Sequence, residues 1–338
     1  MIYFGAADVH SNNTCLGIID ERGQKVFRRK VHNYRKLILH ELEPFKDKLQ
    51  GLVVESTFNW YWIVDALEEA GYSVHLANPA AIKPYEGMKH SNDFDDAFHL
   101  ANLLRLGILS EGTIFPKELR AVRDLLRKRL MLVRHRTAHI LSFQSLYCRQ
   151  TGFMLRGSDV QRFRDREFDD LSDLEYVQLA GKANIDSMRF LSSQIEKIEK
   201  KVLAVMNLQP QFQKLKTITG IGDILGLTIA LETGEISRFQ KVGHYTSYCR
   251  LVSTQRLSND KKKGQGNSKN GNKHLCWAFI EAANFARRYC PHAKRFYQRK
   301  MAKTKKVVAT KALAHKLARA AYFLMRDQVD YNPHLLFG

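Results

Sequence analysis

Four acidic residues lie where their carboxylates could share a divalent cation. Asp8 follows the apolar start of the chain, and Glu55 ends the apolar segment GLVVES in the same way. Asp93 and Asp96 are three residues apart at the start of the segment SNDFDDAFHLANLL, so a helix there places both on one face. Carboxylates held this close repel unless a cation lies between them. The pattern predicts a Mg²⁺ or Mn²⁺ site that activates an attacking oxygen and stabilises a leaving oxygen at phosphorus.

Each acid also has an ordinary explanation. Asp93 could cap a helix, and Asp8 could be a turn residue at the end of a strand. The occurrence of all four acids in the right order on suitable elements is less easily explained in this way, which favours the metal site.

The elements expected to position these acids alternate between strands and helices. Apolar and alternating segments predict five strands and two helices in the order 2–9, 14–20, 25–32, helix 34–48, 51–56, helix 60–71 and 73–79. Three antiparallel strands followed by βαβ units are typical of an α/β ribonuclease H-like domain, of which the RuvC-like domains are one kind. Strands one and four are neighbours in such a sheet, which would bring Asp8 and Glu55 together.

Two long helical patterns follow the acids. Apolar residues recur at helical spacing from Leu119 to Ile140, and from Met188 to Val205 they alternate in steps of three and four, as in a coiled-coil seam. We expect a long antiparallel arm or a dimer interface with residues 156–170 at its tip, and a bundle that packs only on its own chain is the alternative.

Three domains are predicted: 1–115 with the acids, 116–207 as the helical coiled-coil arm, and 208–330 as a mainly α-helical domain. The last begins with TITGIGDILGLTIALETG, 217–234, which looks like a helix-hairpin-helix whose turn amides could meet a phosphate. An ordinary packing corner between two helices is the commoner explanation of such glycines.

The net charge indicates a polyanionic partner. The chain has 54 Lys and Arg against 34 Asp and Glu, a formal charge of +20. The stretch from Lys261 to Arg319 holds 17 of the basic residues and one acid, Glu281. Nucleic acid is therefore favoured over a merely soluble surface. The cations predicted to contact it are Arg256, Lys261, Lys262, Lys263, Lys269, Lys273, Arg287, Arg288, Lys305 and Lys306.

Other partners and compartments fit less well. No uninterrupted apolar run approaches the roughly 20 residues of a membrane span, and the first ten residues lack the order of a signal peptide. The five cysteines are scattered without a C-x-x-C pair, which argues against a disulfide framework or a zinc site. These features predict a protein of the reducing cytoplasm, associated with the nucleoid.

One serine stands among cations. The segment 251–275 is polar, basic and rich in glycine, and a helix is expected to begin near His274. Ser258 lies between Arg256 and Lys261, cations that could attract a phosphodiester as a serine oxygen attacks phosphorus. On chemistry alone Ser253 and Ser268 compete with it, and an unremarkable surface serine is the simpler explanation.

Together these residues resemble the insertion-sequence-one-ten transposases, also called DEDD transposases, to which Piv-type DNA invertases belong. The resemblance covers nearly the whole chain. It rests on Asp8, on VVES with Glu55, on NPAAIKPY ahead of DFDDAFHLA, and on TGIG with the downstream block Ser-x5-G-x3-SKNGNKHL.

The resemblance implies a RuvC-like domain whose four acids, here Asp8, Glu55, Asp93 and Asp96, bind Mg²⁺. It also implies a separate transposase domain whose serine, here Ser258, becomes joined to a DNA end. The expected partners are DNA, at the element ends and the target, a bridge RNA made by the element, and further copies of the chain in a dimer or tetramer. In such an oligomer one subunit's acids work with another's serine.

Two positions depart from the family pattern. The glycine that usually follows the serine is Asn259, and the usual Ala-Gly-Leu upstream is Cys249-Arg250-Leu251. Asn tolerates a left-handed backbone nearly as well as Gly does, so the turn after Ser258 is expected to persist.

Two other activities remain as alternatives. A Holliday-junction resolvase-like nuclease would use only the acids and water, and would need no second domain bearing a serine. A non-catalytic DNA- or RNA-binding protein would tolerate loss of Asp8 and Glu55, and the intact acids argue against it.

Overall fold

The computed structural model describes residues 1–82, 92–168, 171–206, 210–253, 257–259, 261–264 and 270–338. Contacts divide these residues into two compact units. The first is formed by Met1–Lys117, and the second by Glu118–Gly264 with Gly271–Gly338.

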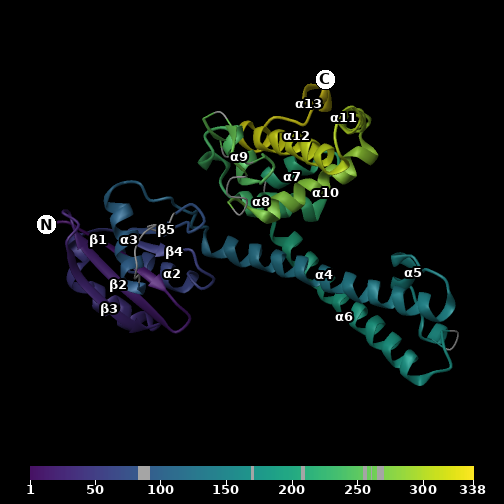
Figure 1. The fold of residues 1–338 in the computed structure, drawn as a ribbon, viewed down its shortest axis with the longest axis horizontal. Coiled ribbons are helices and arrows are strands. Elements are labelled where there is room, and N and C mark those ends of the chain that lie inside the picture. Colours follow the sequence, from purple (N-terminus) through teal and green to yellow (C-terminus); the bar gives the residue numbers. More distant parts are fainter. Residues whose placement is uncertain (83–91, 169–170, 207–209, 254–256, 260, 265–269) are drawn as a thin grey trace. The chain divides into compact units, whose positions relative to one another are not determined.

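The first unit is built on a five-stranded mixed sheet with the strand order β3-β2-β1-β4-β5 (Figure 1). Its strands are β1 Tyr3–Val9, β2 Asn13–Asp20, β3 Lys25–His32, β4 Leu49–Glu55 and β5 Val74–Ala77. Strands β1, β2 and β3 pair antiparallel, whereas β1, β4 and β5 are parallel. The predicted neighbourhood of the first and fourth strands is confirmed.

The burial of each strand follows its place in the sheet. Leu52, Val53 and Val54 of β4 are fully buried, as expected of a parallel strand covered on both faces. Strand β3, KVFRRKVH, is mostly exposed at the sheet edge, where its cations discourage pairing with another strand.

Helices cover both faces of the sheet. One face packs against α1 Arg35–Leu42 and α2 Tyr61–Glu69, with the 3-10 turn η1 Glu43–Lys48 leading into β4. The other packs against α3 Asp93–Arg105. Gly17 on β2 allows this helix to approach, because a Cβ there would lie 3.2 Å from the Phe98 ring. The sheet thus fixes the start of α3 near the ends of β1 and β4.

The second unit begins with a helical arm. Helix α4 Lys117–Thr151 runs beside α6 Glu175–Met206 in the opposite direction, and α5 Gly157–Gln161 and η2 Asp165–Phe168 lie between them in the chain (Figure 1). Arg129 Nε donates to Glu199 Oε1 at 2.7 Å and His139 Nδ1 lies 3.2 Å from Asn184 Oδ1, as antiparallel helices require.

The predicted seam of the second arm helix is only partly buried. Ile195 and Val202 are 2% and 1% exposed, whereas Val205 is 52% exposed. The apolar repeat therefore packs along the middle of α6 but not at its last turn.

The remaining helices pack around α12 Lys306–Asp327, whose Leu313, Leu317 and Tyr322 are fully buried. The other elements of this part are α7 Pro210–Lys216, α8 Asp223–Thr233, η3 Ile236–Arg238, α9 Val242–Tyr248, β6 Leu257–Ser258, β7 Lys261–Lys262, α10 Lys273–Tyr289, α11 Pro291–Met301 and α13 Pro333–Phe337.

The glycine turn before α8 has a packing role. Gly220 adopts a φ of 102°, and a Cβ at this position would lie 2.5 Å from the carbonyl oxygen of Ala282 on α10. Only glycine permits so close an approach of the turn to the helix. The packing explanation of the TGIG motif therefore has direct support.

All five cysteines are free. Among the described residues, every helix is too short or too polar to cross a bilayer.

Candidate functional site

The ends of two parallel strands bring the first two acids together. Ala7 of β1 pairs with Val54 of β4, so the residues that follow, Asp8 and Glu55, are neighbours at this edge of the sheet. Asp8 is 5% exposed, and Glu55 is half-buried. Both positions were predicted from the apolar stretches that precede them.

The first turn of α3 carries the other two acids. Asn92 is the N-cap, because its side-chain oxygen accepts from the amides of Phe94 and Asp95 at 3.0 and 3.2 Å. The cap role considered for Asp93 is therefore wrong, and Asp93 is the first residue of the helix. Asp96 follows three residues later and is exposed. Negative charge in a first helical turn is favoured by the helix dipole.

The electrostatics of the four acids are those of one cluster. Burial raises the pKa of Asp8, and the charges of Asp96 and Asp93 raise it further, whereas His10 and Lys30 lower it. Burial likewise raises the pKa of Glu55, with further contributions from Asp8 and Asp96. Carboxyls that raise one another's pKa bind protons or a cation more readily than isolated ones. The four acids together therefore favour the binding of a cation.

Two basic side chains and a thiol surround Asp93. Lys30 Nζ donates to Asp93 Oδ2 at 3.1 Å, which lowers the pKa of Asp93. His10 Nε2 lies 3.2 Å from Asp8 Oδ2 and 3.4 Å from Asp93 Oδ2. The Cys15 thiol is 3.9 Å from the same Asp93 oxygen.

These groups fit a divalent cation. One ligand atom from each of His10, Cys15 and Asp93 lies within 4.8 Å of the others. His10 Nε2 lies beside carboxylate oxygens of both Asp8 and Asp93, so the imidazole could join these acids as a ligand. Carboxylate oxygens suit Mg²⁺ and Mn²⁺, whereas imidazole and thiolate also suit softer metals.

The serine region lies in the second unit. Ser258 of β6 pairs with Lys261 of β7, and the turn between them contains Asn259 at a φ of 51°. Upstream, Arg250 adopts a φ of 56°. Both departures from glycine thus lie in the left-handed region that glycine favours, and the persistence expected of the turn at Asn259 is confirmed.

The predicted nucleic-acid cations differ in their surroundings. Those with exposed side chains are Lys261, Lys263, Lys273, Arg288, Lys305 and Lys306. Arg287 is half-buried, lies over the Tyr297 ring and donates to its hydroxyl at 3.2 Å. Lys262 lies in β7, and Arg256 and Lys269 lie outside the described residues.

Comparisons with known proteins cover both units. A family model described as "Transposase IS116/IS110/IS902 family" matches residues 212–298. A transposase model of the DEDD type named for IS110 matches residues 6–147, which include all four acids. The chain belongs to this family of transposases.

Relatives of the transposase are similar over most of their length. A "Probable family 20 transposase" of Pseudomonas aeruginosa is 25% identical over 290 residues, which cover 81% of this chain and 82% of the relative. The "Transposase for insertion sequence element IS1111A" of Coxiella burnetii is 25% identical over 330 residues, which cover 93% of this chain and 87% of the relative.

Sequence reasoning missed three residues around the acids of the transposase. His10 follows Asp8 by two positions, and the strand period of two could have placed both on one face. Cys15 pairs with Asp8 across the β1–β2 hairpin, which requires the register of that hairpin. Lys30 reaches Asp93 from β3, and no local pattern indicates that contact.

Proposed function

We propose that this transposase cuts and rejoins DNA at the ends of an insertion sequence, with a RuvC-like first unit and Ser258 as the nucleophile. The observation that carries the proposal is the gathering of four carboxylates at one sheet edge, where burial and mutual repulsion raise the pKa values of Asp8 and Glu55. The strand order β3-β2-β1-β4-β5 supports the ribonuclease H-like assignment.

The four acids would hold Mg²⁺ or Mn²⁺ between them. A bound divalent ion supplies positive charge to a phosphodiester and favours ionisation of an attacking oxygen. Asp8 and Glu55 are held by the sheet, and Asp93 and Asp96 by the first turn of α3. The carboxylates are therefore positioned before charge develops on the phosphate during the reaction. Lys30 and His10 compensate Asp93 until the cation binds.

The serine step exchanges one phosphoester for another. Ser258 Oγ forms a bond to phosphorus as the bond from phosphorus to the departing deoxyribose oxygen breaks. The hydroxyl proton leaves the serine, and the departing oxygen gains a proton. Lys261 and Lys263 lie close to Ser258 in the chain and would favour the incoming phosphate.

Three further parts of the proposal rest on the family resemblance. The protein would act as a dimer or tetramer in which one copy's acids serve another copy's serine. A bridge RNA would pair with the target and the donor DNA, so that base pairing and not a recognition helix supplies the sequence specificity. The reaction could be integration, excision or the inversion typical of Piv-type enzymes.

The test is a search for a covalent protein–DNA adduct. Purified protein, Mg²⁺, labelled DNA spanning the element junction and RNA transcribed from the element's flank are incubated together and separated under denaturing conditions. We expect an adduct that is lost in Ser258→Ala and in Asp8→Ala, with Ser253→Ala as the matched serine control. Cleavage without an adduct would instead support a nuclease that uses the acids and water.

A further inference from the structure

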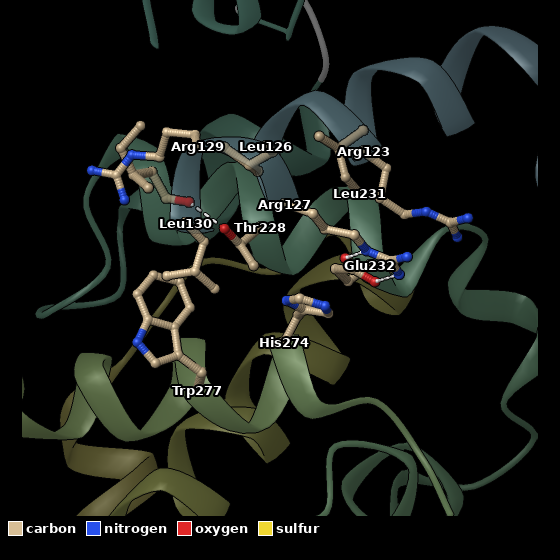
Figure 2. A pocket seen from close by; sticks show the side chains of 11 residues that line it. Arg123, Leu126, Arg127, Arg129, Leu130, Thr228, Leu231, Glu232, His274 and Trp277 are labelled. Atoms are coloured by element: carbon tan, nitrogen blue, oxygen red, sulfur yellow. Dashed lines mark hydrogen bonds and ion pairs between the residues drawn. The ribbon is translucent and has the colours of Figure 1, made fainter. Parts of the chain in front are cut away.

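A buried ion pair joins helices α4 and α8 in the second unit. Glu232 on α8 is 2% exposed, and Arg127 from α4 donates to both of its carboxylate oxygens, at 2.6 and 2.7 Å. Figure 2 shows this pair meeting at the side of a pocket that His274 of α10 also lines. Two helices distant in the sequence are thus joined by one bidentate contact.

A third segment joins the same carboxylate. The side-chain amide of Asn272 donates to Glu232 Oε2 at 2.7 Å. The oxygen of that amide accepts from the backbone amides of His274 and Leu275, at 2.8 and 3.1 Å, and so caps α10. Asn272 therefore uses both ends of its side chain, one to start a helix and one to hold Glu232.

Asn272 also joins the two ends of the segment that carries Ser258. Its backbone amide donates to the carbonyl of Tyr248 at 2.6 Å, and Arg250 Nε donates to the carbonyl of Gly271 at 2.9 Å. Gly271 has a φ of 89°, and a Cβ there would lie 2.5 Å from the Tyr248 oxygen. These two hydrogen bonds join residues 248–250, where the chain leaves the helical core, to residues 271–272, where it returns. We call these two short stretches the neck of the serine segment.

A buried carboxylate is a costly way to fill this space. Burial opposes ionisation of Glu232, yet the hydrogen bonds from Arg127 and Asn272 outweigh it and lower the pKa of the carboxyl. An apolar side chain would fill the site without desolvating a charge. What the charge adds is direction, because its oxygens are satisfied only when α4, α8 and Asn272 stand in one arrangement.

We infer that Glu232 is a positioning residue that, through Asn272, holds the neck of the serine segment in the geometry required for attack on DNA. Arg127 fixes Glu232 to the root of the helical arm, so the arm and the neck share one carboxylate. The inference rests on the proposed role of Ser258. It adds a residue that touches no DNA and acts through the placement of the nucleophile.

Substitutions at Asn272 separate the clasp, the contact of Asn272 with Glu232, from the helix cap. Asn272→Asp and Asn272→Ser both keep a side-chain oxygen suited to an N-cap but remove the donor to Glu232. Arg129→Gln is the matched control, because it removes another ion pair of the arm, that of Arg129 with Glu199 on α6.

Two measurements read the clasp in the full-length protein. Hydrogen exchange in peptides covering 248–251 and 271–275 reports on the neck, and the single-turnover rate of adduct formation reports on the serine. For Asn272→Asp we expect exchange about tenfold faster and adduct formation at least about tenfold slower, with the Kd for DNA changed less than about twofold. Arg129→Gln should leave both rates within about twofold of wild type.

The outcomes separate the two proposals. Neck exchange in Asn272→Asp equal to that in Arg129→Gln would overturn the clasp. Fast exchange with an unchanged adduct rate would overturn the role of the clasp in placing the serine. An adduct that persists in Ser258→Ala would overturn the nucleophile assignment instead, and the exchange data would still decide whether Glu232 holds the neck.

Discussion

The acid cluster and the serine segment are stabilised in different ways. The acids stand on strand ends and a first helical turn, so main-chain hydrogen bonds of the sheet and of α3 set their positions. Ser258 stands on a strand of two residues, and the neck of its segment depends on a few side chains, chiefly Glu232 and Asn272. Substitutions of the acids should therefore change the chemistry of the site and leave its backbone geometry unchanged. Substitutions of Glu232 or Asn272 should change the position of the serine, although neither residue contacts DNA in this proposal.

The largest effect is expected at the acids. Asp96→Ala and Asp8→Asn should each reduce DNA cleavage by about 10³-fold or more, because each removes a carboxylate that is proposed to hold the divalent cation. DNA binding should be equal or tighter, since an acid repels phosphate. The measurement is cleavage rate beside Kd and the thermal unfolding temperature.

Asp95→Ala is the control on the same helix, because Asp95 faces Lys25 at 3.3 Å instead of the other acids. It should keep cleavage within a few-fold of wild type. Unfolding of Asp96→Ala would break the contrast between the two regions, since it would make the acid a structural residue.

The next effect concerns the cations beside the serine. Replacing Lys261, Lys262 and Lys263 by Ala should weaken binding to all DNA sequences alike and reduce the slope of log K against log salt by about 1 for each phosphate that is no longer neutralised. Replacing three exposed lysines of α6, Lys197, Lys200 and Lys201, gives the same change in net charge. An equal change of slope in both variants would show that the serine segment has no special role in binding phosphate.

A smaller effect is expected in the pH dependence of the protein's stability, through Asp8. The pKa of Asp8 is raised in the folded protein, so the folded state holds this proton more tightly than the unfolded state does. Without metal, stability from this group is therefore lost as the pH rises from the unfolded pKa through the folded one, and above both it stays lower. Asp8→Asn should therefore be more stable than wild type at pH 7 in EDTA and unfold at a higher temperature.

Thermal melting between pH 4 and 8, with EDTA or with Mg²⁺, measures this difference. Mg²⁺ should stabilise wild type increasingly as the pH rises and leave Asp8→Asn nearly unchanged. A wild type that is more stable than Asp8→Asn in EDTA at pH 7 would contradict the mutual repulsion of the acids.

The smallest effect is expected at the turn after the serine. Asn259 has a φ of 51°, so Asn259→Gly should be nearly neutral, whereas Asn259→Ala should cost about 1 kcal/mol. Urea unfolding measures the cost, and adduct formation should slow in the Ala variant only. Equal stability of the Ala and Gly variants would mean that the positive φ is not maintained in solution.

The acid region could be predicted because its signals are local. Asp8 and Glu55 each end an apolar strand, and Asp93 and Asp96 have helical spacing, so short-range periodicity and the pairing of the first and fourth strands were sufficient. The contacts that tune the acids were not predictable in this way. Lys30 reaches Asp93 across 63 residues of sequence, and its side chain does so from an edge strand that only the sheet register places.

The clasp could not be predicted, because each of its contacts is long-range. Arg127 and Glu232 are 105 residues apart, and Asn272 is 40 residues beyond Glu232. In the sequence Glu232 looks like one more polar residue in an apolar helix, and Arg127 like one of many arm cations. The packing that buries Glu232 gives these residues their role, and no periodicity encodes it.

The two positive-φ residues near Ser258 also affect the unfolded chain. Glycine at positions 250 and 259 would adopt the folded backbone without strain, but it would give the denatured chain more conformations to lose. Arg250 and Asn259 restrict the denatured chain more than glycine would, but each meets a steric cost in the left-handed region, of about 1–2 kcal/mol for a residue such as Arg and less for Asn. At Arg250 the steric cost exceeds the entropic gain, so the hydrogen bonds between residues 248–250 and 271–272 hold a strained backbone at the start of the segment that carries Ser258.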